Sequence, residues 1–274
     1  MKLEVLVATM NQSDLSLVKR MNLGCDAILA NQCGSWQQLR SEEDGNTFRM
    51  VCTDTRGVGL NRNLALAMTD ADIVLFADDD VTYYDGTLEG VKEAFRQLPD
   101  ADVIVFGLDM TKNGEVFDKR RCKVKRLQLF NALKYGAARM AVRPAALKKH
   151  NIWFSTLFGG GCPYGSGEDS LLLRDCFRAG LRVYSHDYVL GKCAKDSSSW
   201  FDGFGEKFMY DKGAWIACAF PRCKHLIKWY FIRKFSKKTT LSPAQVTRWI
   251  NAGIRGFGNL QYFPQENAAR EEIL

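Results

Sequence analysis

The chain has 274 residues, of which 46% are hydrophobic and 25% charged. This is the composition of a globular protein, and it excludes a disordered chain and a collagen. The length allows one large domain or two small ones. Lys and Arg number 38 against 31 Asp and Glu, which gives a net charge of +7.

The positive charge is concentrated near the C-terminus. Residues 207–238 contain nine basic residues and one acidic residue, a local balance of +8. The remainder, with 29 basic and 30 acidic residues, has a balance of −1. A negatively charged partner is therefore expected to meet this segment and not the whole surface.

The cysteines and the N-terminus indicate the cellular compartment. The nine cysteines are an odd number without CxxC spacing, which predicts reduced thiols and neither a disulfide framework nor a zinc site. No signal-peptide pattern follows Met1. The apolar run at residues 213–220 is far shorter than the about 20 residues that a membrane span needs. We expect a cytoplasmic protein.

Short apolar runs alternate with helix-like segments in the first part of the chain. Strands are predicted at residues 3–9, 27–30, 48–52, 73–77 and 103–107, and helices at 14–23, 61–68 and 87–98. This alternation predicts an α/β fold with a Rossmann-like, mostly parallel sheet flanked by helices. Such sheets bind ligands at the carboxyl ends of their strands.

The pattern changes after residue 107. Asn113-Gly114 is a hairpin signal, and a strand is predicted at 138–142. A glycine-rich loop at 158–167 precedes a helix at 169–179 and a last strand at 181–185. From residue 205 the chain is helical, basic and aromatic. We therefore predict a domain over 1–204, with halves 1–110 and 111–204, and a helical extension over 205–274.

Three carboxylates follow the strand predicted at 73–77. Asp78, Asp79 and Asp80 repel one another, and a divalent cation would remove that penalty. Oxygen ligands suit Mg²⁺ or Mn²⁺, which also bind substrate phosphates. In an extended chain Asp78 and Asp80 point the same way, so they are predicted to share one metal. The alternative is a solvated turn at the end of the strand.

A glycine pair lies one helix upstream of these carboxylates. Gly57 and Gly59 look like the start of a dinucleotide fingerprint. Arg62 occupies the third glycine position, and the motif does not follow the first strand, so a nicotinamide site is not expected.

The order of these motifs resembles family 2 of the GT-A glycosyltransferases. Those enzymes commonly read N-x-G-x-x-x-A-R-N before the strand that ends in D-x-D, and the end of the first strand is similar to their P-T-Y-N nucleotide loop. The resemblance covers roughly residues 3–215. It implies that the first half of the domain binds the nucleotide-sugar donor and the second half the acceptor. The implied donor-binding residues are Thr9, Asn11, Asn31, Gly57, Arg62, Asp78 and Asp79.

Glu168 and Asp169 open the helix after the glycine-rich loop. Acidic residues in a first turn also complement the helix dipole, which is the structural alternative. Their position is similar to that of the family's E-D motif, and this makes Asp169 the general base for the acceptor hydroxyl, with Glu168 orienting the acceptor or the loop.

Five further residues are candidates for the site. Gly160 and Tyr164 belong to a loop expected on the acceptor side, and a plain surface loop is the alternative. Lys195 and Trp200 lie in a segment that resembles one closing over the donor in some family members, with Lys195 near the diphosphate and Trp200 stacking on sugar. His186 is predicted as a third metal ligand beside Asp78 and Asp80.

The basic segment at residues 223–238 interleaves lysines with aromatic residues. On a helix, Ile227, Tyr230, Phe231 and Phe235 share one face. Such a helix is typical of a protein lying on an anionic membrane, and packing on the catalytic domain is the alternative. No nucleic-acid-binding motif accompanies it, so nucleic acid is not an expected partner.

The resemblance implies an inverting hexosyltransferase-type enzyme. It would move a sugar from a nucleotide-diphosphate sugar, UDP favoured, to a hydroxyl of a saccharide or lipid-linked acceptor, with Mn²⁺ or Mg²⁺, in the making of a cell-envelope polysaccharide. A sugar-phosphate nucleotidyltransferase is one alternative, although the glycine-rich loop it needs after the first strand is missing. A non-catalytic membrane-surface protein is the other, and it leaves the two acidic motifs unexplained.

Overall fold

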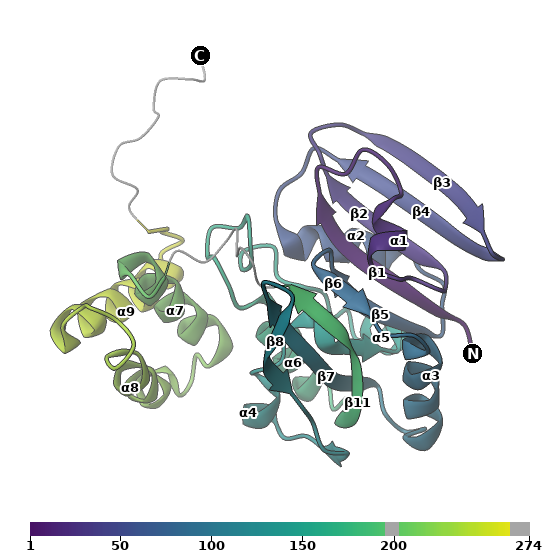
Figure 1. The fold of residues 1–274 in the computed structure, drawn as a ribbon. Coiled ribbons are helices and arrows are strands. Elements are labelled where there is room, and N and C mark those ends of the chain that lie inside the picture. Colours follow the sequence, from purple (N-terminus) through teal and green to yellow (C-terminus); the bar gives the residue numbers. More distant parts are fainter. Residues whose placement is uncertain (195–202, 264–274) are drawn as a thin grey trace. The chain divides into compact units, whose positions relative to one another are not determined.

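The computed structural model describes residues 1–194 and 203–263, and the chain divides into two compact units (Figure 1). The first contains residues 1–156 and 168–199, and the second residues 157–167 and 200–274. The loop at 157–167, which we assigned to the acceptor half of the first domain, thus groups with the C-terminal helices. Tyr164 is buried in this second unit, where its ring lies 4.7 Å from that of Phe158 and 6.0 Å from that of Phe257.

The first unit is built on one mixed sheet with the order β3-β4-β2-β1-β5-β10-β7-β11-β6, while β8 pairs with β7 and β9 with β11. Neighbouring strands are parallel from β4 through β2 and β1 to β5, and again between β7 and β11. The strands are β1 Leu3–Met10, β2 Ala27–Gln32, β3 Gln37–Glu43, β4 Asn46–Thr53, β5 Ile73–Asp78, β6 Val81–Tyr83, β7 Val103–Lys112, β8 Glu115–Arg120, β9 Lys125–Arg126, β10 Met140–Val142 and β11 Val183–Ala194.

Helices cover both faces of this sheet. One core, around Val5 and Leu75, includes residues of α1 and α3, and the other, around Leu6 and Phe76, includes residues of α2, α5 and α6. Side chains of alternating residues enter opposite cores, so the central strands are apolar along most of their length. The helices of this unit are α1 Leu17–Arg20, α2 Val58–Met68, α3 Thr87–Gln97, α4 Leu129–Ala132, the 3₁₀ turn η1 Ala137–Arg139, α5 Pro144–Lys149 and α6 Glu168–Arg178.

The predicted α/β class and mostly parallel sheet are confirmed, and several elements differ in detail. The strand β3 was not predicted, because its sequence QQLRSEE is polar and its side chains are mostly exposed. The strand β11 runs to Ala194, well beyond the predicted end at 185. The helix predicted at 14–23 shrinks to α1, one turn long.

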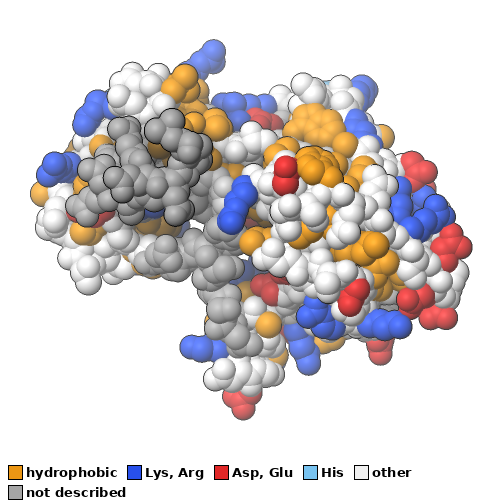
Figure 2. All heavy atoms as spheres, turned by 90° about the horizontal axis from the view of Figure 1, so that it is seen from above, with side chains coloured by type: hydrophobic (Ala, Val, Ile, Leu, Met, Phe, Trp, Pro, Cys, Tyr) orange, Lys and Arg blue, Asp and Glu red, His pale blue; other side chains and the backbone are white. Residues whose placement is uncertain are grey.

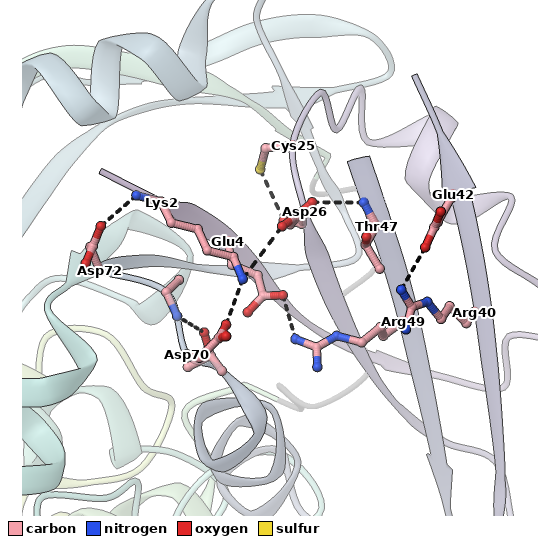
Figure 3. A network of polar contacts seen from close by, with 12 residues as sticks. Lys2, Glu4, Cys25, Asp26, Arg40, Glu42, Thr47, Arg49, Asp70 and Asp72 are labelled. Carbon is pink, nitrogen blue, oxygen red and sulfur yellow. Dashed lines mark hydrogen bonds and ion pairs between the residues drawn. The ribbon is translucent and has the colours of Figure 1, made fainter. Parts of the chain in front are cut away.

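Ion pairs surround the amino ends of the central strands (Figure 3). Lys2 Nζ lies 2.7 Å from Asp70, its backbone N–H donates to Asp72, and Arg49 pairs with the buried Glu4 at 2.8 Å. This network fixes the end of the sheet opposite to the carboxyl ends. Over the face drawn in Figure 2, basic and acidic side chains are interspersed on the first unit, as the balance of −1 outside residues 207–238 leads one to expect.

The second unit contains α7 Glu206–Ala219, α8 Lys224–Phe235 and α9 Pro243–Gly258. Glycines let α7 and α9 cross closely: a Cβ at Gly213 would lie 2.2 Å from the Ile250 carbonyl, and one at Gly253 1.9 Å from that of Tyr210. Ser242 and Gln245 form a capping box at the start of α9. Among the described residues, no helix is both long and apolar enough to cross a membrane.

Candidate active site

The carboxylates after β5 lie beside the end of β1. The two strands are parallel, with Ala8 opposite Asp78, so Thr9 comes level with the acidic cluster. The Thr9 hydroxyl donates a 2.6 Å hydrogen bond to Asp79. The structure therefore brings two of the predicted donor-binding motifs together at the carboxyl edge of the sheet, where open α/β sheets bind ligands.

Asp80 lies in a less favourable environment than an ordinary surface carboxylate. Its backbone C=O accepts a hydrogen bond from Ala194, and the Cys193 thiol lies 3.4 Å from its carboxyl. Surrounding protein atoms, and secondly the negative charge of Asp78, raise the pKa of Asp80 to about 6. A nearby cation would reverse this shift, because it would stabilise the ionised form.

The first turn of α2 connects the ends of three strands. Gly57 precedes the helix with a φ of 114°, a conformation that favours glycine, and its C=O accepts from the Gln32 side chain. The buried Asn61 amide donates to the carbonyls of Thr9 and Ala30. The following residue, Arg62, is thereby fixed beneath the carboxylates of β5.

Arg62 connects the two acidic motifs. Its guanidinium donates to Asp78 at 2.7 Å, to Glu168 at 3.0 Å and to Asp169 at 3.1 Å. Only 4% of its side-chain surface is exposed, and its charge lies over the Phe154 ring. One buried cation thus faces three carboxyl groups. We assigned Arg62 to donor binding; in the structure it pairs with the acidic residues themselves.

The Asp169 carboxyl is largely surrounded by protein atoms but stays partly accessible to solvent. The Ala137 N–H donates to it, a Cβ at Gly136 would lie 3.4 Å from its Oδ2, and 26% of its side chain stays exposed. Burial first, and then the charge of Glu168, raise the pKa of Asp169 to about 8, although Arg62 acts in the opposite direction. A carboxyl with such a pKa suits proton transfer near neutral pH.

The loop after β1 is held by Asn31. The Asn31 amide donates to the Gln12 carbonyl at 2.7 Å and accepts from the Gln12 N–H at 3.1 Å. Because Asn31 is fully buried, we correct its assignment: its side chain positions the loop and does not line a donor surface. Asn11 is exposed at the end of the strand with a φ of 55°, and stays a donor-binding candidate.

His186 does not reach the acidic cluster. Its Nε2 lies 3.2 Å from Gln97 Oε1, and its Nδ1 accepts from the Tyr188 N–H. It lies seven residues before Cys193 on β11, and the contacts of this strand with Asp80 come from Cys193 and Ala194. The geometry thus contradicts the prediction of His186 as a ligand beside Asp78 and Asp80.

The candidates of the glycine-rich loop have structural partners. Tyr164 has 1% of its surface exposed and donates to the Gln261 carbonyl, so it is a core residue of the second unit and its assignment to the acceptor was wrong. Gly160 lies in a turn closed by hydrogen bonds between residues 159 and 164. Lys195 and Trp200 lie outside the described residues.

Asp78 and Asp80 offer the carboxylate oxygens that a hard divalent cation takes as ligands. Mg²⁺ is usually bound by one or two carboxylates together with substrate phosphates. Over residues 1–194 and 203–263, no group of three or more His, Cys, Asp or Glu side chains is arranged to hold an ion. A metal here would rely on the phosphates of the substrate.

Comparison with known proteins points in the same direction. Residues 31–151 match the family model described as Glycosyl transferase family 2. The structure of S. aureus TarS residues 1–349 in complex with UDP-GlcNAc is similar at 14% identity, with a TM-score of 0.61 over 96% of this chain and 93% of that one. The complex of the same protein with UDP gives 18% identity and a TM-score of 0.60, over 92% and 79%. No curated protein matches the sequence.

The fold is that of these glycosyltransferase structures, and residues 31–151 match the family 2 model. The resemblance to family 2, first seen in the order of the sequence motifs, is confirmed over that part of the chain, and it supports the prediction of a transferase.

Proposed function

We propose that this enzyme transfers a sugar from a UDP-sugar to a hydroxyl of a saccharide or lipid-linked acceptor, with inversion at the anomeric carbon. The observation that carries the proposal is the contact of Arg62 with both Asp78 and Asp169. It joins a carboxylate cluster suited to a phosphate-bound metal to a single carboxyl of raised pKa. One base opposite the leaving group is what a single displacement requires.

Each residue of the site has its own role in this reaction. Asp169 removes the proton of the acceptor hydroxyl as that oxygen attacks, and Glu168 and Arg62 hold the Asp169 carboxyl in place. Thr9 orients Asp79 on the donor side. Bound by Asp78 and Asp80, Mn²⁺ or Mg²⁺ would supply positive charge next to the departing diphosphate.

We expect one nucleotide class to stabilise the protein only when a metal is present. UDP is the first choice, because the similar S. aureus TarS structures hold UDP-GlcNAc and UDP. The measurement is thermal shift and donor hydrolysis with UDP-, GDP- and dTDP-sugars, with and without Mn²⁺. Asp80→Ala should abolish the metal-dependent part, because it removes one of two protein ligands.

Asp187→Ala is the matched control for this panel. Asp187 is an exposed carboxylate on β11, away from the cluster, and its loss should leave donor binding unchanged. Equal binding of all nucleotide sugars with and without metal would contradict the proposed role of Asp78 and Asp80.

We also propose that α8 rests on an anionic membrane at the cytoplasmic side. Leu226, Trp229 and Tyr230 are 73%, 64% and 60% exposed, and their spacing places them on one side of the helix. The opposite side, with Ile232 and Phe235, is buried within the second unit. The apolar face predicted for this helix is thus only partly buried. Phe235 packs inside the second unit, whereas aromatic residues that lie among basic ones stay exposed.

Flotation with vesicles rich in phosphatidylglycerol tests this role. Trp229→Ser with Tyr230→Ser should reduce the bound fraction at least fivefold, because interfacial aromatic residues anchor such helices. Trp36→Ser is the control, since Trp36 is 68% exposed but lies in the first unit. Equal flotation of the wild type and the double variant would refute the membrane role of α8.

A further inference from the structure

An open cavity of about 400 Å³ in the first unit is lined almost entirely by cations. It lies between the β8 end and the segment before β10. Its lining residues are Lys119, Arg120, Arg121, Lys134, Tyr135 and Arg139. Five positive charges around one cavity repel one another, and a negatively charged occupant would relieve this repulsion.

Acidic neighbours neutralise only part of this charge. Arg121 pairs with Asp109, which also accepts from Tyr84, and Arg120 pairs with Asp118. In the described part of the chain, no carboxylate lies within ion-pair distance of Lys119, Lys134 or Arg139.

Arg139 is the fixed element of the cavity wall. It is 8% exposed, and its guanidinium donates to the carbonyls of Phe106 and Arg120 and packs on the Tyr135 ring. These contacts orient its charge without cancelling it. The exposed Lys119 and Lys134 add two cations at the rim, so three positive charges remain for a ligand.

The cavity lies next to the proposed base. Tyr135 and Arg139 line it. Between them, the Ala137 N–H donates to the Asp169 carboxyl, and a Cβ at Gly136 would lie 3.4 Å from it. A 3₁₀ turn rises about 2 Å per residue, so Ala137 and Arg139 are separated by only about 4 Å along its axis. Residues 135–139 thus form one short segment that both lines the cavity and contributes the hydrogen bond to the Asp169 carboxyl.

The order of the strands separates this cavity from the donor side. On one side of β5 lie β1, which carries Thr9, and α2, which carries Asn61 and is preceded by Gly57. The cavity belongs to β8 and η1, which lie beyond β5 in the direction of β7. Asp169 contacts Arg62 on one side and the Ala137 N–H on the other, and thus lies between the two regions.

From this arrangement we infer that the acceptor carries phosphate groups, and that Lys119, Lys134 and Arg139 bind one of them beside the hydroxyl that Asp169 deprotonates. This inference rests on the proposed function and specifies its acceptor. Phosphate matches the cavity because Arg and Lys donors recognise its oxygens through charge-assisted hydrogen bonds. A neutral saccharide would leave the three cations unpaired.

Titration calorimetry with glycerol 3-phosphate, and with glycerol as its neutral counterpart, tests the inference. The wild type should bind only the phosphate ester, and Lys119→Glu with Lys134→Glu should weaken that binding at least tenfold. Both lysines are exposed, so the variant is expected to fold normally. Lys123→Glu with Lys125→Glu is the matched control, because these exposed lysines of the same region do not line the cavity.

Other ligands separate the alternatives. UDP binding should change less than twofold in Lys119→Glu/Lys134→Glu; its loss would assign the cavity to the donor and overturn the inference. The inference also fails if the variant loses only vesicle binding, which would indicate a lipid surface, or if both variants weaken glycerol 3-phosphate equally. Because UDP-sugar binding by the wild type is measured separately, failure of the proposed function is distinguishable from failure of this inference.

Discussion

Asp169→Asn is expected to reduce sugar transfer about 10²–10⁴-fold, the usual contribution of a general base, while UDP-sugar binding stays unchanged. The amide keeps the shape of the carboxyl but cannot take the proton of the acceptor hydroxyl. The expected signature is a lower kcat at constant donor KM. Asp175→Asn, on the same helix and close to Arg178, is the control and should keep full activity.

The pH profile gives a second readout of the same group. Burial and Glu168 raise the pKa of Asp169 to about 8, and the base is active only when deprotonated. The value of kcat/KM should therefore rise with pH and level off above about pH 8. Glu168→Gln removes a negative neighbour and should move this limb to lower pH. A flat profile from pH 6 to 9, or an active Asp169→Asn, would exclude Asp169 as the base.

The sheet and the two acidic motifs could be predicted because their signals are local. Apolar runs such as Ile73–Asp78 followed by several carboxylates indicate a strand end in any α/β fold. The turn at Asn113-Gly114 could also be predicted, because these two residue types favour the positive φ values that they adopt here, 50° and 81°. The polar β3 had no such signal, because its pairing with β4 is made by backbone groups.

The partners of charged residues could not be predicted, since they depend on contacts across the chain. Arg62 and Asp169 are 107 residues apart, and no local pattern shows that they meet. For the same reason Asn31 and Tyr164 looked like ligand-binding residues, although the structure buries both. His186 was assigned from its place in the chain, and the length of β11 moves it away from the cluster. The basic cavity joins residues 119–121 to 134–139 and has no sequence motif.

Arg62→Ala should both unfold the site and destabilise the protein. Removing one partner of a buried ion pair costs about 3–5 kcal/mol, because the remaining charges stay buried without compensation. Here three carboxylates would lose their common cation. At about 2–4 °C per kcal/mol for a chain of this size, the melting temperature should fall by about 10 °C. Differential scanning calorimetry at pH 9, above the Asp169 pKa of about 8, measures it, and Arg96→Ala, which breaks an exposed pair with Glu93, should change it little.

A second substitution distinguishes lost neutralisation from lost packing. If the defect of Arg62→Ala is repulsion among Asp78, Glu168 and Asp169, then adding Asp169→Asn removes one of the charges and should recover several degrees. Arg62→Lys should lie between, since it keeps a charge but cannot bridge three carboxylates with a planar group. If the double variant melts no higher than Arg62→Ala, the destabilisation comes from the cavity left beside Phe154, and the guanidinium is not the charge that holds the two acidic motifs together.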